Sequence, residues 1–145
     1  MDDRRFVEAL MAAVPEAFDR PSAREDYLDD EPLAYPALGH ARIWLEDHAI
    51  KIWLVPLRAR VRPGREDVVR RFWAFVEDQA QAGAGDVALE NLLQIECFEG
   101  VGWVEDLGEY LGPRTRELLV DAQDGLARSN GQIGRWAPSW RTRRR

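Results

Sequence analysis

The sequence predicts an all-α protein, a compact bundle of five to six helices. Apolar residues recur at helical spacing in several long segments, proline and glycine turns separate these segments, and no two segments share a strand-like pattern. Apolar residues form 46% of the 145-residue chain, which is enough for one hydrophobic core. Stacked helix pairs are one arrangement that suits such a bundle. We therefore expect one helical domain over residues 1–131 and a separate tail over 132–145.

The first helix is expected to begin at a capping Asp2 or Asp3 and to run to about Val14, with its apolar residues on one face. The segment 18–32 is polar and contains two prolines. It is therefore expected to be a loop, with one helical turn from Ser22 to Leu28.

A second helix is expected to begin at Pro36, and its apolar residues cover most of its surface, which is typical of a central helix. Its polar stripe contains His40, while His48 lies on an apolar face. The final part, IKIWLVPL at 50–57, is ambiguous because short apolar runs rich in branched residues also form strands. We favour helix because no second segment has a comparable pattern, with Pro56 kinking or ending it.

Four more helices are expected after the turn at residues 62–64. The segment from about 65 to 81 has the clearest amphipathic pattern in the chain. The next helix is capped by Asp86 and ends near Gly100, a short one covers about 104–111, and the last begins at Pro113. Leu118, Leu119, Ala122 and Leu126 are the residues of the last helix expected to face the core.

Charge is unevenly divided along the chain. The whole chain carries −6 and the tail carries +5, so the rest of the chain carries −11. An acidic body repels nucleic acid and attracts basic partners. No apolar run reaches the roughly 18 residues of a membrane helix, and the N-terminal segment lacks the long apolar core of a signal peptide. These features predict a protein of the cytoplasm with no membrane partner.

The sequence contains no complete catalytic or metal-binding motif. His40 and His48 are eight residues apart and point in different directions on a helix, and HExxH and GxSxG are both absent. Cys97 is the single cysteine, and its apolar neighbours indicate a packed thiol rather than a nucleophile. We therefore predict no metal, no cofactor and no enzymatic activity.

Glu96 is the one acid placed among apolar residues of an expected helix, on the arc formed by Leu89, Leu92, Leu93 and Ile95. A buried carboxylate needs a partner. One interpretation is a structural contact, either with the backbone N–H groups at a helix start or with a basic side chain, for which the candidates are Arg42, His48, Arg70 and Arg71. The other is that Glu96 lines a groove used by a binding partner.

The densest acidic run lies in the loop before the second helix and consists of Asp26, Asp29, Asp30 and Glu31. Such a run is a candidate binding surface for a basic protein, and the alternative is a solvated loop with no partner.

The tail mixes Trp136 and Trp140 with five arginines, and basic residues among aromatic ones can bind RNA. We favour a tail that folds back onto the acidic body, because exposed tryptophan is costly. Nucleic-acid binding is expected only through this tail, whose basic residues are Arg135, Arg141, Arg143, Arg144 and Arg145.

Two segments, VALENLLQIECFEGVGW and LGEYLGPRTRELL, resemble a family of small, uncharacterised bacterial helical proteins. The resemblance is clearest over residues 66–119, is loose over the N-terminal third, and does not include the basic tail. Members of that family are similar to immunity proteins encoded beside secreted toxins. The resemblance implies a helical protein that inhibits a partner, and it carries over no catalytic residues.

These observations predict a non-enzymatic protein-binding module, an immunity-type inhibitor that blocks a basic toxin by occlusion. Asp26, Asp29, Asp30, Glu31 and Glu96 are its candidate binding residues. The alternative is a small enzyme or ligand-binding protein with a pocket around Glu96, His48 and Trp44.

Overall fold

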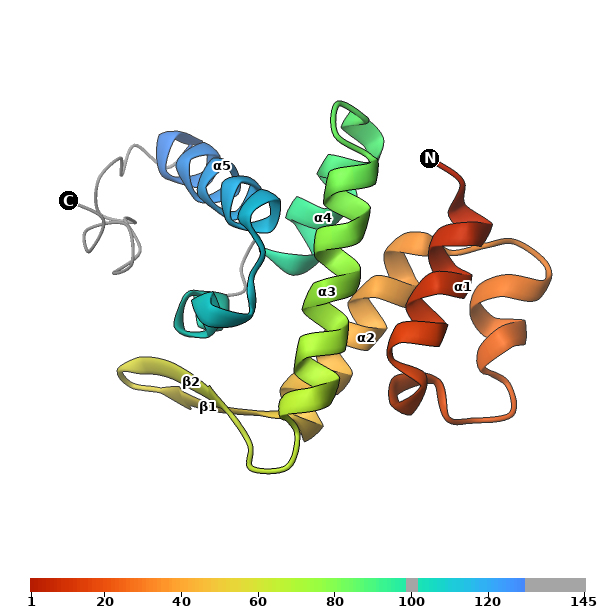
Figure 1. The fold of residues 1–145 in the computed structure, drawn as a ribbon, viewed down its shortest axis with the longest axis horizontal. Coiled ribbons are helices and arrows are strands. Elements are labelled where there is room, and N and C mark those ends of the chain that lie inside the picture. Colours follow the sequence, from red (N-terminus) through yellow and green to blue (C-terminus); the bar gives the residue numbers. More distant parts are fainter. Residues whose placement is uncertain (99–101, 130–145) are drawn as a thin grey trace.

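A computed structural model describes residues 1–98 and 102–129 of the chain. Helices surround a hydrophobic core, and a two-stranded hairpin extends from one end of the body (Figure 1). The long helices are α1 (Asp3–Ala13), α2 (Ala34–His48), α3 (Glu66–Ala82), α4 (Val87–Cys97) and α5 (Pro113–Ser129). The shorter elements are η1 (Pro15–Phe18), η2 (Glu25–Asp29), β1 (Ile50–Leu54), β2 (Leu57–Val61) and η3 (Gly102–Tyr110). The mostly helical character is confirmed, but the two-stranded antiparallel sheet means that the chain is not strictly all-α.

The hairpin corrects the helix that we favoured for residues 50–57. β1 and β2 pair antiparallel, with Leu54 opposite Leu57 and Lys51 opposite Arg60. Pro56 lies in the turn between the strands, after a cis peptide bond, and does not kink a helix. β2 was not predicted as a strand, because arginines alternate with the apolar residues of LRARV and the segment does not read as an apolar run.

Sequence reasoning located the helix starts well. The Asp2 side chain caps α1 by accepting a hydrogen bond from the Arg5 N–H at 3.2 Å. Asp86 caps α4 in the same way through the Leu89 N–H at 3.2 Å. These contacts satisfy N–H groups that have no partner within their own helix. α4 ends at Cys97, earlier than the predicted end near Gly100.

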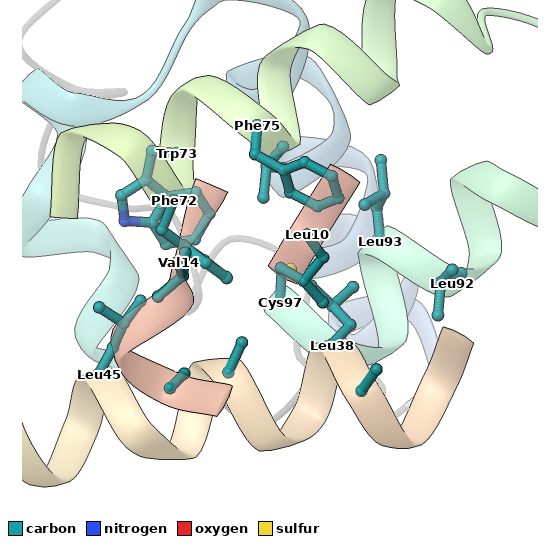
Figure 2. Packing of buried hydrophobic residues seen from close by; sticks show 14 of the residues in the cluster. Leu10, Val14, Leu38, Leu45, Phe72, Trp73, Phe75, Leu92, Leu93 and Cys97 are labelled. Carbon is teal, nitrogen blue, oxygen red and sulfur yellow. The ribbon is translucent and has the colours of Figure 1, made fainter. Parts of the chain in front are cut away.

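The core lies where α1, α2, α3 and α4 meet, and side chains from all four helices point into it (Figure 2). The apolar face predicted for α3 is buried as expected, and it comprises Val68, Val69, Phe72, Trp73, Phe75 and Val76. On α5, Leu118, Leu119 and Ala122 are buried, while the side chain of Leu126 lies outside the description. In the described ranges, no helix is long and apolar enough to cross a bilayer.

The two histidines exchange their expected environments. His40 packs between Phe18 and Tyr27, and its Nε2 lies 2.6 Å from the carbonyl oxygen of Ala17. His48 is exposed at the end of α2. The prediction had placed His48 on the buried face, because it extended the helix beyond the residue at which α2 actually ends.

Candidate functional site

The acidic run occupies the surface segment between η1 and α2. Residues 19–31, called here the acidic segment, contain six acids and two arginines. Asp26 accepts a hydrogen bond from Arg20 at 2.7 Å, and Asp29 lies 3.9 Å from Arg24. Asp30 and Glu31 are exposed, and no ion pair to either is found in the described part of the chain. The segment therefore keeps a negative charge after its internal pairing.

Buried side chains hold the acidic segment against the helices. Leu28 of η2 is fully buried, and Ala23 is nearly so. The Tyr27 ring contacts Phe18 edge to face, with centroids 5.8 Å apart, and it also packs on His40 of α2. The Leu33 N–H donates to the Tyr27 carbonyl at 2.9 Å. The structure brings Asp26, Asp29, Asp30 and Glu31 onto one anchored segment.

Glu96 is not enclosed by the core as its sequence position suggested. Its side chain is only partly buried, and its neighbour Ile95 is 45% exposed. The buried face of α4 consists of Leu89, Leu92, Leu93 and Cys97, so Glu96 lies at the margin of that face. The apolar face predicted for this helix was too broad, because it included the exposed Ile95.

Glu96 lies against α2 rather than beside a basic side chain. Its Oε2 would be 2.7 Å from a Cβ atom placed on Gly39, so the missing side chain of this glycine leaves room for the carboxylate. Within residues 1–98 and 102–129, no ion pair joins Glu96 to any of the predicted partners. Arg42 pairs instead with Glu46 on its own helix. Neither the predicted ion pair nor a hydrogen bond from a helix start reaches Glu96 among the described residues, and its carboxylate packs against α2 instead.

The residues proposed for an alternative pocket are not brought together. His48 stacks on Trp44, with ring centroids 4.8 Å apart. Glu96 contacts α2 at Gly39, nine positions before His48. Nine residues of helix correspond to about 13 Å. Glu96 and His48 therefore contribute to different parts of the surface.

Cys97 is fully buried, as the sequence predicted. Burial raises the pKa of its thiol far above the usual value, and the nearby Arg42 opposes this only in part. A thiol that stays protonated and has no access to solvent is a poor nucleophile. The arrangement assigns Cys97 to packing.

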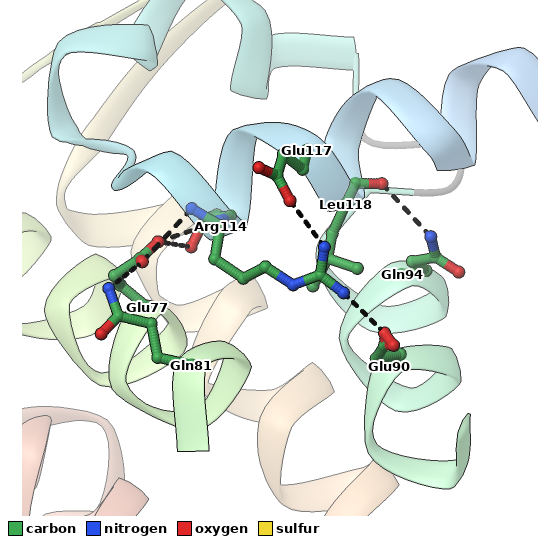
Figure 3. Close-up of polar contacts among 8 residues, drawn as sticks. Glu77, Gln81, Glu90, Gln94, Arg114, Glu117 and Leu118 are labelled. Atoms are coloured by element: carbon green, nitrogen blue, oxygen red, sulfur yellow. Dashed lines mark hydrogen bonds and ion pairs between the residues drawn. The ribbon is translucent and has the colours of Figure 1, made fainter. Parts of the chain in front are cut away.

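A polar cluster that sequence reasoning missed ties α5 to α3 (Figure 3). The Glu77 carboxylate accepts hydrogen bonds from the Thr115 N–H and hydroxyl, both at 2.8 Å, from the Arg114 N–H at 3.3 Å, and from Gln81 at 2.6 Å. Burial raises the pKa of Glu77, but the hydrogen bonds from Thr115, Gln81 and Arg114 outweigh it and leave the pKa below its ordinary value. Glu77 thus caps α5 from another helix.

Arg114 joins α5 to α4 in the same cluster. Its guanidinium donates to Glu90 at 2.9 Å and to Glu117 at 2.6 Å, and these partners raise its pKa (Figure 3). Gln94 of α4 donates to the Leu118 carbonyl at 3.3 Å. The Glu77 carboxylate and both terminal nitrogens of Arg114 have partners within the cluster, whereas the buried Arg114 Nε has none. Carboxylates and cations that are paired across helices in this way are typical of a structural network rather than a catalytic one.

A shallow hollow of about 330 Å³ lies beside this network, between α3 and η3. Glu77 forms part of its wall, but the carboxylate is already occupied by α5. The Arg70 guanidinium lies over the Tyr110 ring at 5.6 Å, where it covers part of the same hollow. None of the predicted binding residues lines this hollow. Among the described residues, no group of three or more metal-ligating side chains is present.

The hairpin was not among the predicted sites, yet it carries the most exposed large apolar side chains of the described residues. Leu54 and Val55 at the turn are 80% and 93% exposed. The chain from residue 48 to 65 contains four arginines, one lysine and no acid. That absence of acids in an otherwise acidic chain was the available signal. The tail, with its five arginines and two tryptophans, lies outside the described residues.

No family model, curated protein or solved structure matches this chain.

Proposed function

We propose that this protein is a non-enzymatic binding module that acts in the cytoplasm and docks a basic protein through its acidic segment. The observation that supports this proposal is that one surface segment, fixed in place by buried side chains, contains Asp26, Asp29, Asp30 and Glu31. A charged surface on a fixed support loses little conformational entropy on binding. It also accelerates encounter with an oppositely charged partner.

An immunity-type inhibitor fits this geometry. Such a protein covers the working surface of a toxin and needs no reactive group of its own. The fully buried Cys97 and the Glu77 carboxylate, whose oxygens are both occupied by hydrogen bonds, are consistent with a protein that acts by contact. The proposed partner is therefore a basic toxin, such as a nuclease, and inhibition is by occlusion. We place Glu96 outside the central contact, because it packs on α2.

Charge reversal in the acidic segment tests the proposal. The full chain and the double variant Asp30→Lys/Glu31→Lys are used to capture proteins from the producing organism, and any protein retained only by the wild type is then purified. Both substituted side chains are exposed, so the fold should tolerate the change. We expect a basic partner whose Kd rises at least tenfold with the double variant and also rises with salt.

The matched control is Asp78→Lys/Asp121→Lys, which makes the same change in net charge at exposed positions of α3 and α5. Its Kd should change less than about threefold. If the two double variants weaken binding equally, total charge and not the acidic segment is responsible. If the purified partner is acidic, or if it is an enzyme that remains fully active when saturated, the proposal is wrong.

A further inference from the structure

The tip of the hairpin presents apolar side chains to solvent. Leu54 and Val55 are 80% and 93% exposed, Leu57 is 48% exposed, and Pro56 lies between them. Single exposed apolar residues are common on proteins, but a contiguous group at the end of a projecting element marks a contact site. Figure 1 shows the turn at the end of the hairpin farthest from α2 and α3, near η3.

Basic side chains lie immediately behind this apolar tip. Lys51 is paired with Arg60, and Trp53 is paired with Arg58, so all four side chains share one face of the hairpin. The Lys51 ammonium lies 5.1 Å from the centre of the Trp53 ring, and the Arg60 guanidinium lies 5.4 Å from it. We call Lys51, Trp53, Arg58 and Arg60 the basic collar.

The opposite face of the hairpin is anchored to the body. Ile50 is fully buried, and the Ala59 N–H donates to Asp106 of η3 at 2.8 Å. A methyl group on Gly102 would lie 2.5 Å from the Leu57 side chain, so the start of η3 packs against Leu57 at the base of the tip. The hairpin is therefore held in one orientation, in which the collar, Leu54 and Val55 are exposed and Leu57 is partly covered by η3.

We propose that the tip and the basic collar dock on an anionic lipid surface. The tip supplies apolar side chains that enter the acyl region, Trp53 suits the interface, and the three cations of the collar suit the lipid headgroups. The sequence-based expectation of no membrane partner rested on the absence of a spanning segment and of a signal peptide, and this contact needs neither.

Other occupants match the hairpin less well. Single-stranded nucleic acid would use the collar but has no apolar region for Leu54 and Val55. A second copy that met this one tip to tip would bring its own cations against the collar. A lipid surface accepts exposed apolar side chains such as Leu54 and Val55, and its negative charge is opposite to that of the collar.

The negative charge of the body does not prevent this contact. Each strand has five residues, and at about 3.3 Å per residue the hairpin is roughly 16 Å long. Charges are largely screened beyond about 8 Å at physiological salt. The junctions of the hairpin with α2 and α3 therefore lie farther from the lipid headgroups than the screening distance when the tip is inserted, whereas η3 lies beside the hairpin.

Sedimentation with lipid vesicles tests the proposal with the full chain. Wild-type protein should bind vesicles of phosphatidylcholine and phosphatidylglycerol in equal parts, and should bind pure phosphatidylcholine at least tenfold less well. Val55→Asp should lower the partition coefficient on anionic vesicles at least tenfold, because an apolar insertion is replaced by a charge. Lys51→Gln/Arg58→Gln should lower it by a similar factor.

The control variant is Val87→Asp, which changes a 69% exposed valine on α4 and should leave vesicle binding unchanged. Every variant keeps the basic tail, so binding by the tail alone would leave Val55→Asp equal to wild type, and that result overturns the proposal. Equal binding to both vesicle types, or no binding, also overturns it. So does retention on a single-stranded oligonucleotide that Lys51→Gln/Arg58→Gln abolishes and Val55→Asp leaves intact.

Labelling at the tip gives a second measurement. Cys97 is fully buried, so Val55→Cys supplies the single accessible thiol of the described residues for an environment-sensitive fluorophore. On anionic vesicles the emission of this label should shift to the blue, as expected for transfer into an apolar phase. An unshifted spectrum on vesicles that sediment with the protein overturns the insertion.

Discussion

Replacing Glu77 with alanine should remove about 3 kcal/mol from the free energy of unfolding. The carboxylate is the acceptor for two backbone N–H groups at the start of α5 and for the fully buried Thr115 hydroxyl. A buried donor that loses its partner costs about 1–3 kcal/mol. The loss would be largest if none of the three donors found a new partner. Water entering the neighbouring hollow would replace some of the lost bonds, so we expect a loss of stability well below that limit.

Urea unfolding followed by circular dichroism measures this loss. With a slope of about 2 kcal/mol per molar, a typical value, the midpoint should fall by about 1.5 M. Glu109→Ala is the matched control, because Glu109 lines the same hollow but is exposed, and it should change the midpoint by less than about 0.3 M. If Glu77→Ala behaves like Glu109→Ala, the cap on α5 adds no stability and the reasoning fails.

The pH dependence supplies a further check on Glu77. Its pKa in the folded protein lies below the ordinary value of 4.5. A lowered pKa stabilises the fold above that ordinary value, and this contribution disappears as the pH falls through the lower folded value. The stability difference between wild type and Glu77→Ala should therefore be greatest near neutral pH and shrink below about pH 4.5. A difference that grows on acidification contradicts the assignment.

Two other predictions concern the contact of α4 with α2. Gly39→Ala should raise the free energy of unfolding by less than about 0.5 kcal/mol in the wild type but by about 1 kcal/mol in a Glu96→Ala background. Alanine favours the helix, but in the wild type its methyl group meets the Glu96 carboxylate. Equal effects of Gly39→Ala in the two backgrounds, measured by urea unfolding, would show that Glu96 does not occupy this space. Cys97 should remain unreactive towards a disulfide reagent in the native protein at mildly alkaline pH and react fully in guanidinium, since burial raises the pKa of its thiol; rapid native labelling would show that the core opens.

The elements that sequence reasoning predicted correctly have strong local signals. α3 was located almost to the residue because apolar side chains from Val68 to Val76 recur at helical spacing. α1 and α4 were located by their capping residues, Asp2 and Asp86, each of which acts within three residues of itself. Local chemistry is readable from sequence because the interacting groups are neighbours in the chain.

The features that were missed depend on contacts between distant residues. Glu77 lies 38 positions before Thr115, and no local pattern indicates that one caps the helix of the other. The Ala59 N–H finds its acceptor on Asp106, 47 positions away. The hairpin itself is local, and it was missed because arginines occupy the outward positions of β2.

The candidate site was predicted in part. Sequence reasoning found the acidic segment from its charge, but it could not show that Leu28 anchors the segment. It overestimated the burial of Glu96, because a helical projection shows which residues share a face and not how wide the contact is. The exposure of Val55 follows from the turn, and so became visible only with the hairpin.

The two strands of the hairpin leave and rejoin the body at one place, where the Arg62 N–H donates to the Ala49 carbonyl at 2.8 Å. Leu54 and Val55 are largely exposed, so substitutions at these two positions should have little effect on the packing of the helices. The turn can thus change in length and chemistry during evolution, or in the laboratory, while the same scaffold persists. A host body of this kind is suited to carrying grafted peptide loops at the position of Val55.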